Sequence, residues 1–222
     1  MSRIRATYDT VALAYDAALR SELAGKPVDR ALLDVLLELS PGIVADVGCG
    51  PGHVTRHLAA RHRAVVGVDL SPAMVSIARA AAPSLSFEVA SMLDLPVADG
   101  AWSGIVAFYS IIHLTPAERR RAFGEFARVL SPGGWVLVSF HVSATDQPPG
   151  STQHTRSWFG SPVDLDSFYL EPAVVRADLA AAGFSVSAST EREPLPDVEY
   201  PSRRCYLLAQ SAGSARSDAQ GL

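Results

Sequence analysis

A glycine-rich stretch around residue 50 has the residue types and spacing of a ligand-binding turn. Residues 44–52 read VADVGCGPG and are followed by a helical pattern at 54–60. Clustered glycines let the backbone approach a ligand closely, because no Cβ intervenes. The free amides at the start of the following helix suit an anionic group such as a carboxylate or a phosphate.

The spacing of these glycines does not match that of a dinucleotide-binding turn. The pattern G-x-G-x-x-G would require a sixth-position glycine where this chain has His53. Here the glycines stand at 48, 50 and 52, and an acid, Asp46, precedes them. A second apolar run, residues 64–68, ends at Asp69, whose carboxylate could bind both hydroxyls of a ribose. The two features predict a ligand with a ribose, and the alternative is a tight turn followed by a surface aspartate.

Histidines at the ends of two further apolar runs are candidates for acid–base chemistry. His113 follows the run 104–109 and is the candidate general base, because histidine titrates near neutral pH. A role in capping the next helix is the alternative for His113. His141 follows the run 135–140 and is a second catalytic candidate if it faces the same pocket. His53 and His57 belong to the helix after the glycines, and we expect them to face solvent.

Tyrosines near the start of the chain could also reach the site. Tyr8 and Tyr15 are seven residues apart, which is about two helical turns, so both can face the same direction. Tyr15 is therefore a third catalytic candidate, and the alternative is that both tyrosines are core aromatics. Tyr109 either contacts the ligand or fills the space above a sheet.

The elements that must position these residues alternate along the chain. Two helices, at 7–19 and 28–39, form an N-terminal cap over residues 1–40. Short apolar runs then alternate with helical patterns, which predicts a mainly parallel sheet covered on both faces. The runs are 43–47, 64–68, 85–89, 104–109, 135–140, 184–188 and 205–209, and the later helices are 54–60, 72–82, 116–130 and 172–182. Ser71-Pro72 and Thr115-Pro116 have the form of helix starts.

An insertion at 142–171 interrupts this alternation. It is rich in Ser, Thr, Pro, Gly and Asp, yet it carries the aromatic residues Trp158, Phe159, Phe168 and Tyr169. A long polar insertion with aromatics is more often a lid or a binding loop than a connector. We expect a single domain over 1–211, and a disordered tail over 212–222.

Composition narrows the classes of function. The 222 residues carry a net charge of −4 and form no basic cluster, which argues against nucleic-acid binding. The chain has two cysteines, too few and too far apart for a metal site or a disulfide framework, so we expect a reducing cytoplasm. No apolar stretch approaches the length of a membrane span, and the start lacks the apolar core of a signal peptide.

Three motifs together resemble the class I S-adenosylmethionine-dependent methyltransferases. They are residues 44–52, 66–71 (VGVDLS) and 128–134 (RVLSPGG), within a similarity that runs from about 8 to 209. The chain is most similar to the small bacterial, actinobacterial-type enzymes that act on small molecules. The resemblance implies a three-layer Rossmann-like sheet of seven strands in the order 3-2-1-4-5-7-6, with the last strand antiparallel. S-adenosylmethionine would lie across the carboxyl ends of strands one to four, and S-adenosylhomocysteine would be the product.

The resemblance also implies roles for individual residues. The glycine bend would contact the methionine part of the cofactor, Asp69 the ribose, and Leu70 and Met74 the adenine or ribose. Relatives often have Gly-Asp-Ala after strand three, and alignment on Leu95-Pro96 places Ser91 where that aspartate stands, which leaves Asp94 as a loop acid. The implied cofactor contacts are Tyr8, Tyr15, Asp46, Gly48, Cys49, Gly50, Asp69, Leu70, Met74, Ser91, Met92, Leu93, Tyr109 and Ser110.

The implied activity is methyl transfer to an oxygen, nitrogen or carbon of a small organic metabolite in specialised metabolism. A monomer or a homodimer would suffice for it. Two alternatives stay open. A nicotinamide-dependent dehydrogenase uses a similar sheet, and a cyclase or another non-methylating protein can bind the same cofactor on the same fold.

Overall fold

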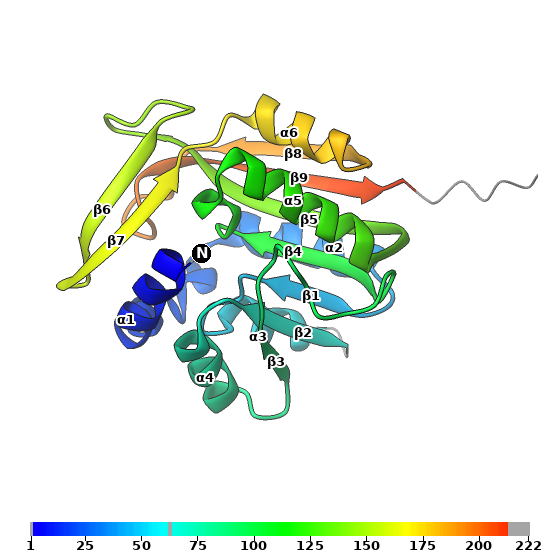
Figure 1. Cartoon of the computed structure of the whole chain (residues 1–222), viewed down its shortest axis with the longest axis horizontal. Coiled ribbons are helices and arrows are strands. Elements are labelled where there is room, and N and C mark those ends of the chain that lie inside the picture. Colours follow the sequence, from blue (N-terminus) through cyan, green and yellow to red (C-terminus); the bar gives the residue numbers. More distant parts are fainter. Residues whose placement is uncertain (1, 62–63, 213–222) are drawn as a thin grey trace, which may run out of the picture.

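A seven-stranded sheet forms the centre of the computed structural model, which describes residues 2–61 and 64–212. The strand order is β3-β2-β1-β4-β5-β9-β8 (Figure 1), and it confirms the predicted order. β9 is antiparallel to both of its neighbours, and the other pairs are parallel. The strands are β1 (Val44–Val47), β2 (Val65–Asp69), β3 (Ser86–Val89), β4 (Trp102–Phe108), β5 (Leu130–Ala144), β8 (Phe184–Arg192) and β9 (Ser202–Ser211).

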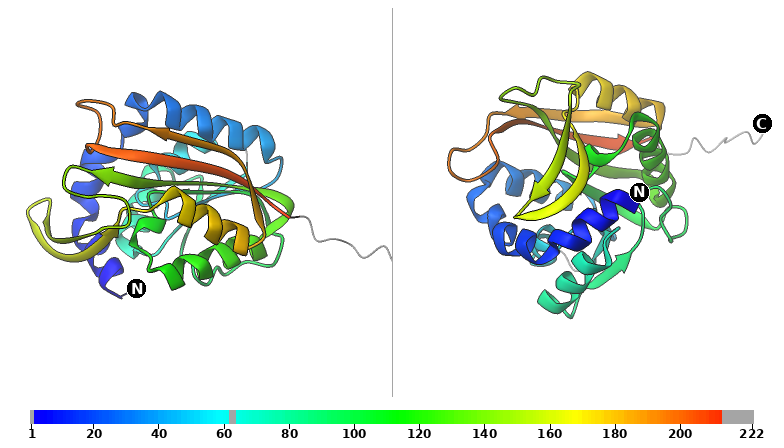
Figure 2. Two further views of the ribbon diagram at one scale, coloured as in Figure 1. Left: turned by 90° about the horizontal axis from the view of Figure 1, so that it is seen from above. Right: turned by 60° about the vertical axis from the view of Figure 1, so that its left-hand side comes forward.

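Helices cover both faces of this sheet. The view from above shows α2 on one side of the sheet, and α5 and α6 on the other (Figure 2). The helices are α1 (Ser2–Leu19), α2 (Pro27–Leu39), α3 (His53–Ala59), α4 (Pro72–Ala81), α5 (Pro116–Val129) and α6 (Pro172–Ala181), with short 3₁₀ turns η1 (Glu22–Gly25) and η2 (Ile111–His113). None of the helices in the described ranges is both long and apolar enough to cross a membrane.

The predicted helix starts at 72 and 116 are confirmed, and their caps show why. The Ser71 hydroxyl accepts a hydrogen bond from the amide of Met74 at 3.1 Å. Thr115 and Glu118 form a reciprocal capping box at the start of α5. In both helices a proline occupies the first position, where no amide partner is needed. The sequence therefore fixes where the chain turns back from β2 and from β4.

Several predicted boundaries were too narrow. α1 begins at Ser2 rather than residue 7, and β5 spans Leu130–Ala144 rather than 135–140. β9 is also longer than predicted and pairs with β5 from Trp135 to Ala144. In this long antiparallel pairing, the backbone N–H and C=O groups of residues beyond the predicted runs are hydrogen-bonded between the strands. The strands therefore extend past the apolar residues that identified them.

The insertion is a β-hairpin with a two-stranded sheet of its own. Its strands are β6 (Thr152–Trp158) and β7 (Ser161–Phe168). The turn residues Phe159 and Gly160 have φ of 50° and 76°, and a tight hairpin turn of type I′ requires such positive angles. The hairpin lies against α1 (Figure 2), where Thr7 donates to the carbonyl of Asp164 and Arg3 pairs with the same residue's carboxylate at 3.3 Å. The predicted tail at 212–222 lies, apart from Ala212, outside the described residues.

Candidate functional site

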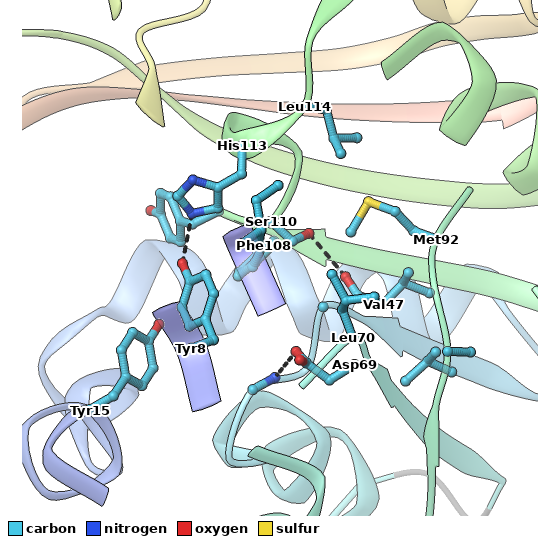
Figure 3. Close-up of a pocket in the computed structure, with 16 residues that line it drawn as sticks. Tyr8, Tyr15, Val47, Asp69, Leu70, Met92, Phe108, Ser110, His113 and Leu114 are labelled. Carbon is cyan, nitrogen blue, oxygen red and sulfur yellow. Dashed lines mark hydrogen bonds between the residues drawn. The ribbon is translucent and has the colours of Figure 1, made fainter. Parts of the chain in front are cut away.

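A cavity opens where the carboxyl ends of β1, β2 and β4 meet α1 (Figure 3). It encloses about 690 Å³ of empty space, including the part open to solvent. Asp69 is the one acidic residue of the wall among the described residues, and the rest of the wall is rich in aromatic and aliphatic groups. The lining residues are Ile4, Tyr8, Tyr15, Val47, Gly48, Gly50, Val68, Asp69, Leu70, Ala90, Met92, Phe108, Tyr109, Ser110, His113 and Leu114.

The glycine bend forms one wall of this cavity, and its glycines have different roles. Gly48 and Gly50 have φ of 82° and 53°, in the left-handed region that favours glycine. A Cβ at Gly48 would overlap the Cβ of Ser110, so Gly48 is needed for packing. A Cβ at Gly50 would meet nothing closer than Tyr15 at 3.9 Å. Gly50 is therefore the position where the bend leaves room for a ligand.

The carboxylate of Asp69 is fixed beside the bend. Its Oδ2 accepts a hydrogen bond from the amide of Gly50, and its Oδ1 accepts one from the amide of Ser71, both at 2.8 Å. Burial raises the pKa of Asp69, and these amide bonds act in the opposite direction. Because each carboxylate oxygen has a further lone pair, Asp69 can still accept two hydroxyl groups from a diol.

His113 and Tyr8 form a hydrogen-bonded pair on the other side of the cavity. Their side chains face each other in Figure 3, with 2.6 Å between His113 Nε2 and the Tyr8 hydroxyl oxygen. His113 Nδ1 lies 3.0 Å from the carbonyl oxygen of Asp166, which can only accept, so Nδ1 carries the hydrogen. Burial lowers the pKa of His113, which keeps the ring neutral and leaves Nε2 as an acceptor. Burial also raises the pKa of Tyr8 well above its ordinary value, so Tyr8 donates to His113.

Aromatic rings from α1 and the hairpin close the cavity from outside. Trp158 makes edge contacts with Tyr8 and Tyr15, with ring centroids 5.7 and 5.5 Å apart. Phe159 stacks on Trp158 at 5.2 Å. The hairpin residues do not line the cavity themselves; they hold the tyrosines of α1 over it. The insertion that the sequence predicts as a lid or a binding loop thus lies behind α1 and off the cavity wall.

A second cavity of about 440 Å³ adjoins the first on the other side of the bend. Both cavities share the wall residues Tyr15, Gly48, Gly50, Phe108 and Tyr109. The remaining wall residues of the second cavity are Glu22, Leu23, Asp29, Asp46, Cys49, His53 and Val54. Burial raises the pKa of Asp46 to about 6, against the hydrogen bond that its Oδ2 accepts from Thr55 at 2.6 Å. Burial likewise raises the pKa of the Cys49 thiol well above its ordinary value.

Tyr109 lies between the two cavities in an unusual backbone conformation. Its φ is 52°, which a non-glycine residue adopts only when its surroundings enforce it. The Tyr109 hydroxyl lies 2.9 Å from the Tyr206 hydroxyl, which donates to Asp29 at 3.0 Å. His141 stacks on the Tyr109 ring, with centroids 5.0 Å apart.

These features have counterparts among known proteins. Residues 44–134 match the family model described as Methyltransferase domain. In a comparison of structures, a SAM-dependent methyltransferase from Methanosarcina mazei has the same fold, with a TM-score of 0.67 and 19% identity over 76% of this chain and 92% of that one. The demethylmenaquinone methyltransferase of Thermus thermophilus is 30% identical over 183 residues, which cover 71% of this chain and 80% of the relative. The chain belongs to the S-adenosylmethionine-dependent methyltransferases.

Another methyltransferase of the family is longer than this chain. The O-methyltransferase cnsE of Penicillium expansum is 32% identical over 188 residues, which cover 78% of this chain. The chain spans 63% of the length of that relative.

Four residues that the sequence assigned to the methyltransferase site lie off the walls of both cavities. Met74 is a fully buried residue of α4, and Leu93 packs in the core. The Ser91 hydroxyl accepts a hydrogen bond from the amide of Leu93 at 3.1 Å. His141 lies behind Tyr109 with its Nδ1 2.6 Å from the Ser202 hydroxyl, so the expectation that it faces the pocket is not met. Burial lowers the pKa of His141 to about 3.

The sequence also misplaced two histidines of α3. His53 and His57 were expected to face solvent, but each side chain is only 10% exposed. His57 packs toward Asp34 of α2, while His53 reaches Glu22 and the second cavity. Glu22 was not recognised as a site residue either, because nothing in its local pattern shows that η1 brings it beside the glycine bend.

Proposed function

We propose that this protein transfers a methyl group from S-adenosylmethionine to a small organic metabolite bound in the first cavity. One observation carries the proposal: a single cavity brings the open side of Gly50 and the carboxylate of Asp69 together with the Tyr8–His113 pair. The open side of Gly50 and the Asp69 carboxylate suit a nucleoside with an extended tail. The Tyr8–His113 pair suits proton transfer from an acceptor. Family membership supports the choice of cofactor.

The residues present fit the proposed cofactor. Asp69 has lone pairs left for the two ribose hydroxyls, and Leu70, Ala90 and Met92 give an apolar wall on which an adenine ring can pack. The tail would pass the bend at Gly50, where a Cβ-sized space is open. When bound, the sulfonium supplies an electrophilic methyl group, so the protein has mainly to align an acceptor and to exclude water.

The Tyr8–His113 pair can take up the proton of a hydroxyl acceptor. The Tyr8 hydroxyl oxygen accepts this proton while its own proton moves to His113 Nε2, 2.6 Å away. The Asp166 carbonyl then stabilises the imidazolium through the hydrogen on Nδ1. His113 thus acts as the base through Tyr8, rather than by direct contact with the acceptor. His141 pairs instead with the Ser202 hydroxyl and lies off the walls of both cavities.

The acceptor is proposed to be a neutral hydroxyl compound of specialised metabolism. The first cavity offers no lysine or arginine on its wall within the described chain, so a carboxylate acceptor would find no counter-charge. The similarity to an O-methyltransferase supports an oxygen acceptor. The sequence motifs further support a place among the small bacterial, actinobacterial-type members of the family.

Titration calorimetry with S-adenosylhomocysteine and a transfer assay with labelled S-adenosylmethionine and a panel of phenols, amines and acids test this function. Asp69→Ala should weaken S-adenosylhomocysteine binding by about tenfold to a hundredfold, since hydrogen bonds to a charged group are lost. Asp94→Ala is the matched control, because Asp94 is exposed and lies off both cavity walls. It should bind like the parent protein.

Three results would count against the proposal. If the parent protein binds no S-adenosylhomocysteine, or if Asp69→Ala binds it unchanged, the cofactor site is wrong. Tight binding without any methylated product would instead favour a non-methylating protein on the same fold.

A further inference from the structure

The second cavity has an acidic wall next to the proposed cofactor site. Glu22, Asp29 and Asp46 line it, and within the described chain no lysine or arginine does. Two of these carboxylates are already engaged: Asp29 pairs with Arg192 at 2.8 Å and accepts from Tyr206, and Glu22 Oε2 pairs with Lys26 at 2.6 Å. A wall of carboxylates away from bulk water favours a cationic ligand group over an anionic one.

His53 projects into this cavity with one ring nitrogen unused. Its Nε2 lies 3.1 Å from Glu22 Oε1, and its side chain is nine-tenths buried. Burial acts to raise the pKa of Glu22, but the hydrogen bonds from His53 and Lys26 lower it to about 2, so Glu22 is an anionic acceptor. The hydrogen of a neutral ring therefore lies on Nε2. Among the described residues Nδ1 has no hydrogen-bond partner, and a buried acceptor of this kind calls for a ligand or a water molecule.

We propose that Glu22 and His53 bind the primary ammonium group at the amino-acid end of S-adenosylmethionine. This inference rests on the proposed function, in which the ribose is held at Asp69. The wall residues Tyr15, Gly48 and Gly50 belong to both cavities, so a ligand that passes the bend from Asp69 enters the acidic one.

The chemistry of the pair matches such a group. An ammonium group donates three hydrogen bonds and accepts none, so it complements the bare Nδ1 of His53. The Glu22 carboxylate, whose Oε2 is paired with Lys26, places Oε1 beside the site and holds the ring in the required tautomer through Nε2. A glycine at position 53, as in a dinucleotide-binding turn, would provide neither the acceptor nor the contact with Glu22.

Calorimetry on the full chain with three ligands tests the assignment. S-adenosylhomocysteine has both the amino and the carboxyl group, its deaminated analogue has only the carboxyl group, and 5′-methylthioadenosine has neither. His53→Ala and Glu22→Gln should each weaken S-adenosylhomocysteine binding by about tenfold to a hundredfold, with little change for the other two ligands. His53→Asn keeps an acceptor near the place of Nδ1 and should stay close to the parent protein.

His57→Ala is the matched control, because His57 lies one turn further along α3 and faces Asp34 at 3.5 Å. Circular dichroism at the assay temperature checks that each variant is folded. If His53→Ala binds S-adenosylhomocysteine like the parent, the proposal is refuted. Equal losses of affinity for all three ligands would show that the pair only shapes the bend. If the affinities for S-adenosylhomocysteine and its deaminated analogue both fall while that for 5′-methylthioadenosine does not, the pair contacts the carboxylate. Either result overturns the assignment, whereas a parent protein that binds none of the ligands refutes the cofactor site itself.

Discussion

Two alanine substitutions in the glycine bend should separate its structural role from its binding role. Both Gly48 and Gly50 have positive φ, so an alanine at either position costs about 1–2 kcal/mol of backbone strain. Only at Gly48 does the new methyl group also meet a neighbour: it would overlap the Cβ of Ser110 and lie 2.8 Å from its Oγ. Ser110 cannot withdraw without losing the hydrogen bond from its Oγ to the carbonyl of Val47, 3.0 Å long.

The expected loss of stability follows from these terms. Forced overpacking costs about 1–3 kcal/mol and the lost hydrogen bond about 1 kcal/mol. With backbone strain included, Gly48→Ala should lower the free energy of unfolding by roughly 3–6 kcal/mol. In a chain of this size that corresponds to a fall in melting temperature of about 6 °C or more. Gly50→Ala introduces only the backbone strain, so its melting temperature should lie within about 8 °C of that of the parent protein.

Gly50→Ala, the variant with the smaller loss of stability, should show the direct loss of ligand affinity. The methyl group of Gly50→Ala enters the open space that both cavities share, so the affinity for S-adenosylhomocysteine should fall although the fold remains. Thermal unfolding followed by circular dichroism, and calorimetry on the folded protein, measure the two effects. The double variant Gly48→Ala/Ser110→Gly removes both opposing atoms and should recover the part of the loss that overpacking causes. If Gly50→Ala destabilises the protein as much as Gly48→Ala does, the division of roles is wrong.

Three further substitutions test the polar groups around the site. Tyr8→Phe breaks the relay to His113, so the turnover of hydroxyl acceptors should fall at least tenfold while calorimetry shows an unchanged affinity for S-adenosylhomocysteine; equal turnover would exclude the relay. His141, whose pKa burial lowers from 6.5 to about 3, binds a proton only in the unfolded state between these values, so the stability it contributes is lost as pH falls below 6.5. This slope is about 1.4 kcal/mol per pH unit, and urea denaturation at pH 7 and 5 should show a shallower dependence for His141→Asn than for the parent. Glu199→Gln leaves buried cations such as Arg204 uncompensated and should cost about 3–5 kcal/mol in urea denaturation, and a cost near zero would show that water already screens them.

Much of the sheet could be predicted because its signals are local. Runs of apolar residues separated by helical patterns identify buried parallel strands, and Pro72 and Pro116 mark where helices begin. The bend at residues 48–52 and the acid at the end of β2 could be recognised for the same reason. Each requires a particular residue type at a fixed position along the chain.

Other features depend on contacts between distant segments and leave no local signal. His53 is buried because η1 places Glu22 against it, 31 residues away. β6 alternates exposed and half-buried residues over most of its length and is polar apart from Trp158, so its strand period does not show in hydrophobicity. His141 is turned away from the cavity because its Nδ1 lies at hydrogen-bond distance from the hydroxyl of Ser202. Ser202 belongs to β9, which pairs in antiparallel register with β5, the strand of His141.

The first thirty residues are an integral part of the site. They lie outside the region of the chain that matches the methyltransferase family model, yet they supply Tyr8, Tyr15 and Glu22 to the cavity walls. Lys26 connects this segment to the loop between β8 and β9. It pairs with Glu22 at 2.6 Å and lies 3.4 Å from Glu199 of that loop.

The side chain of Lys26 also lies over the ring of Tyr109, 5.5 Å from its centroid. Arg204 lies over the same ring at 5.7 Å, and the Tyr109 hydroxyl is held by Tyr206 and Asp29. These contacts secure a residue whose backbone is strained at the point where the two cavities meet. The N-terminal segment therefore helps to hold Tyr109 in place, so the walls of both cavities depend on a segment that lies outside the region matched by the family model.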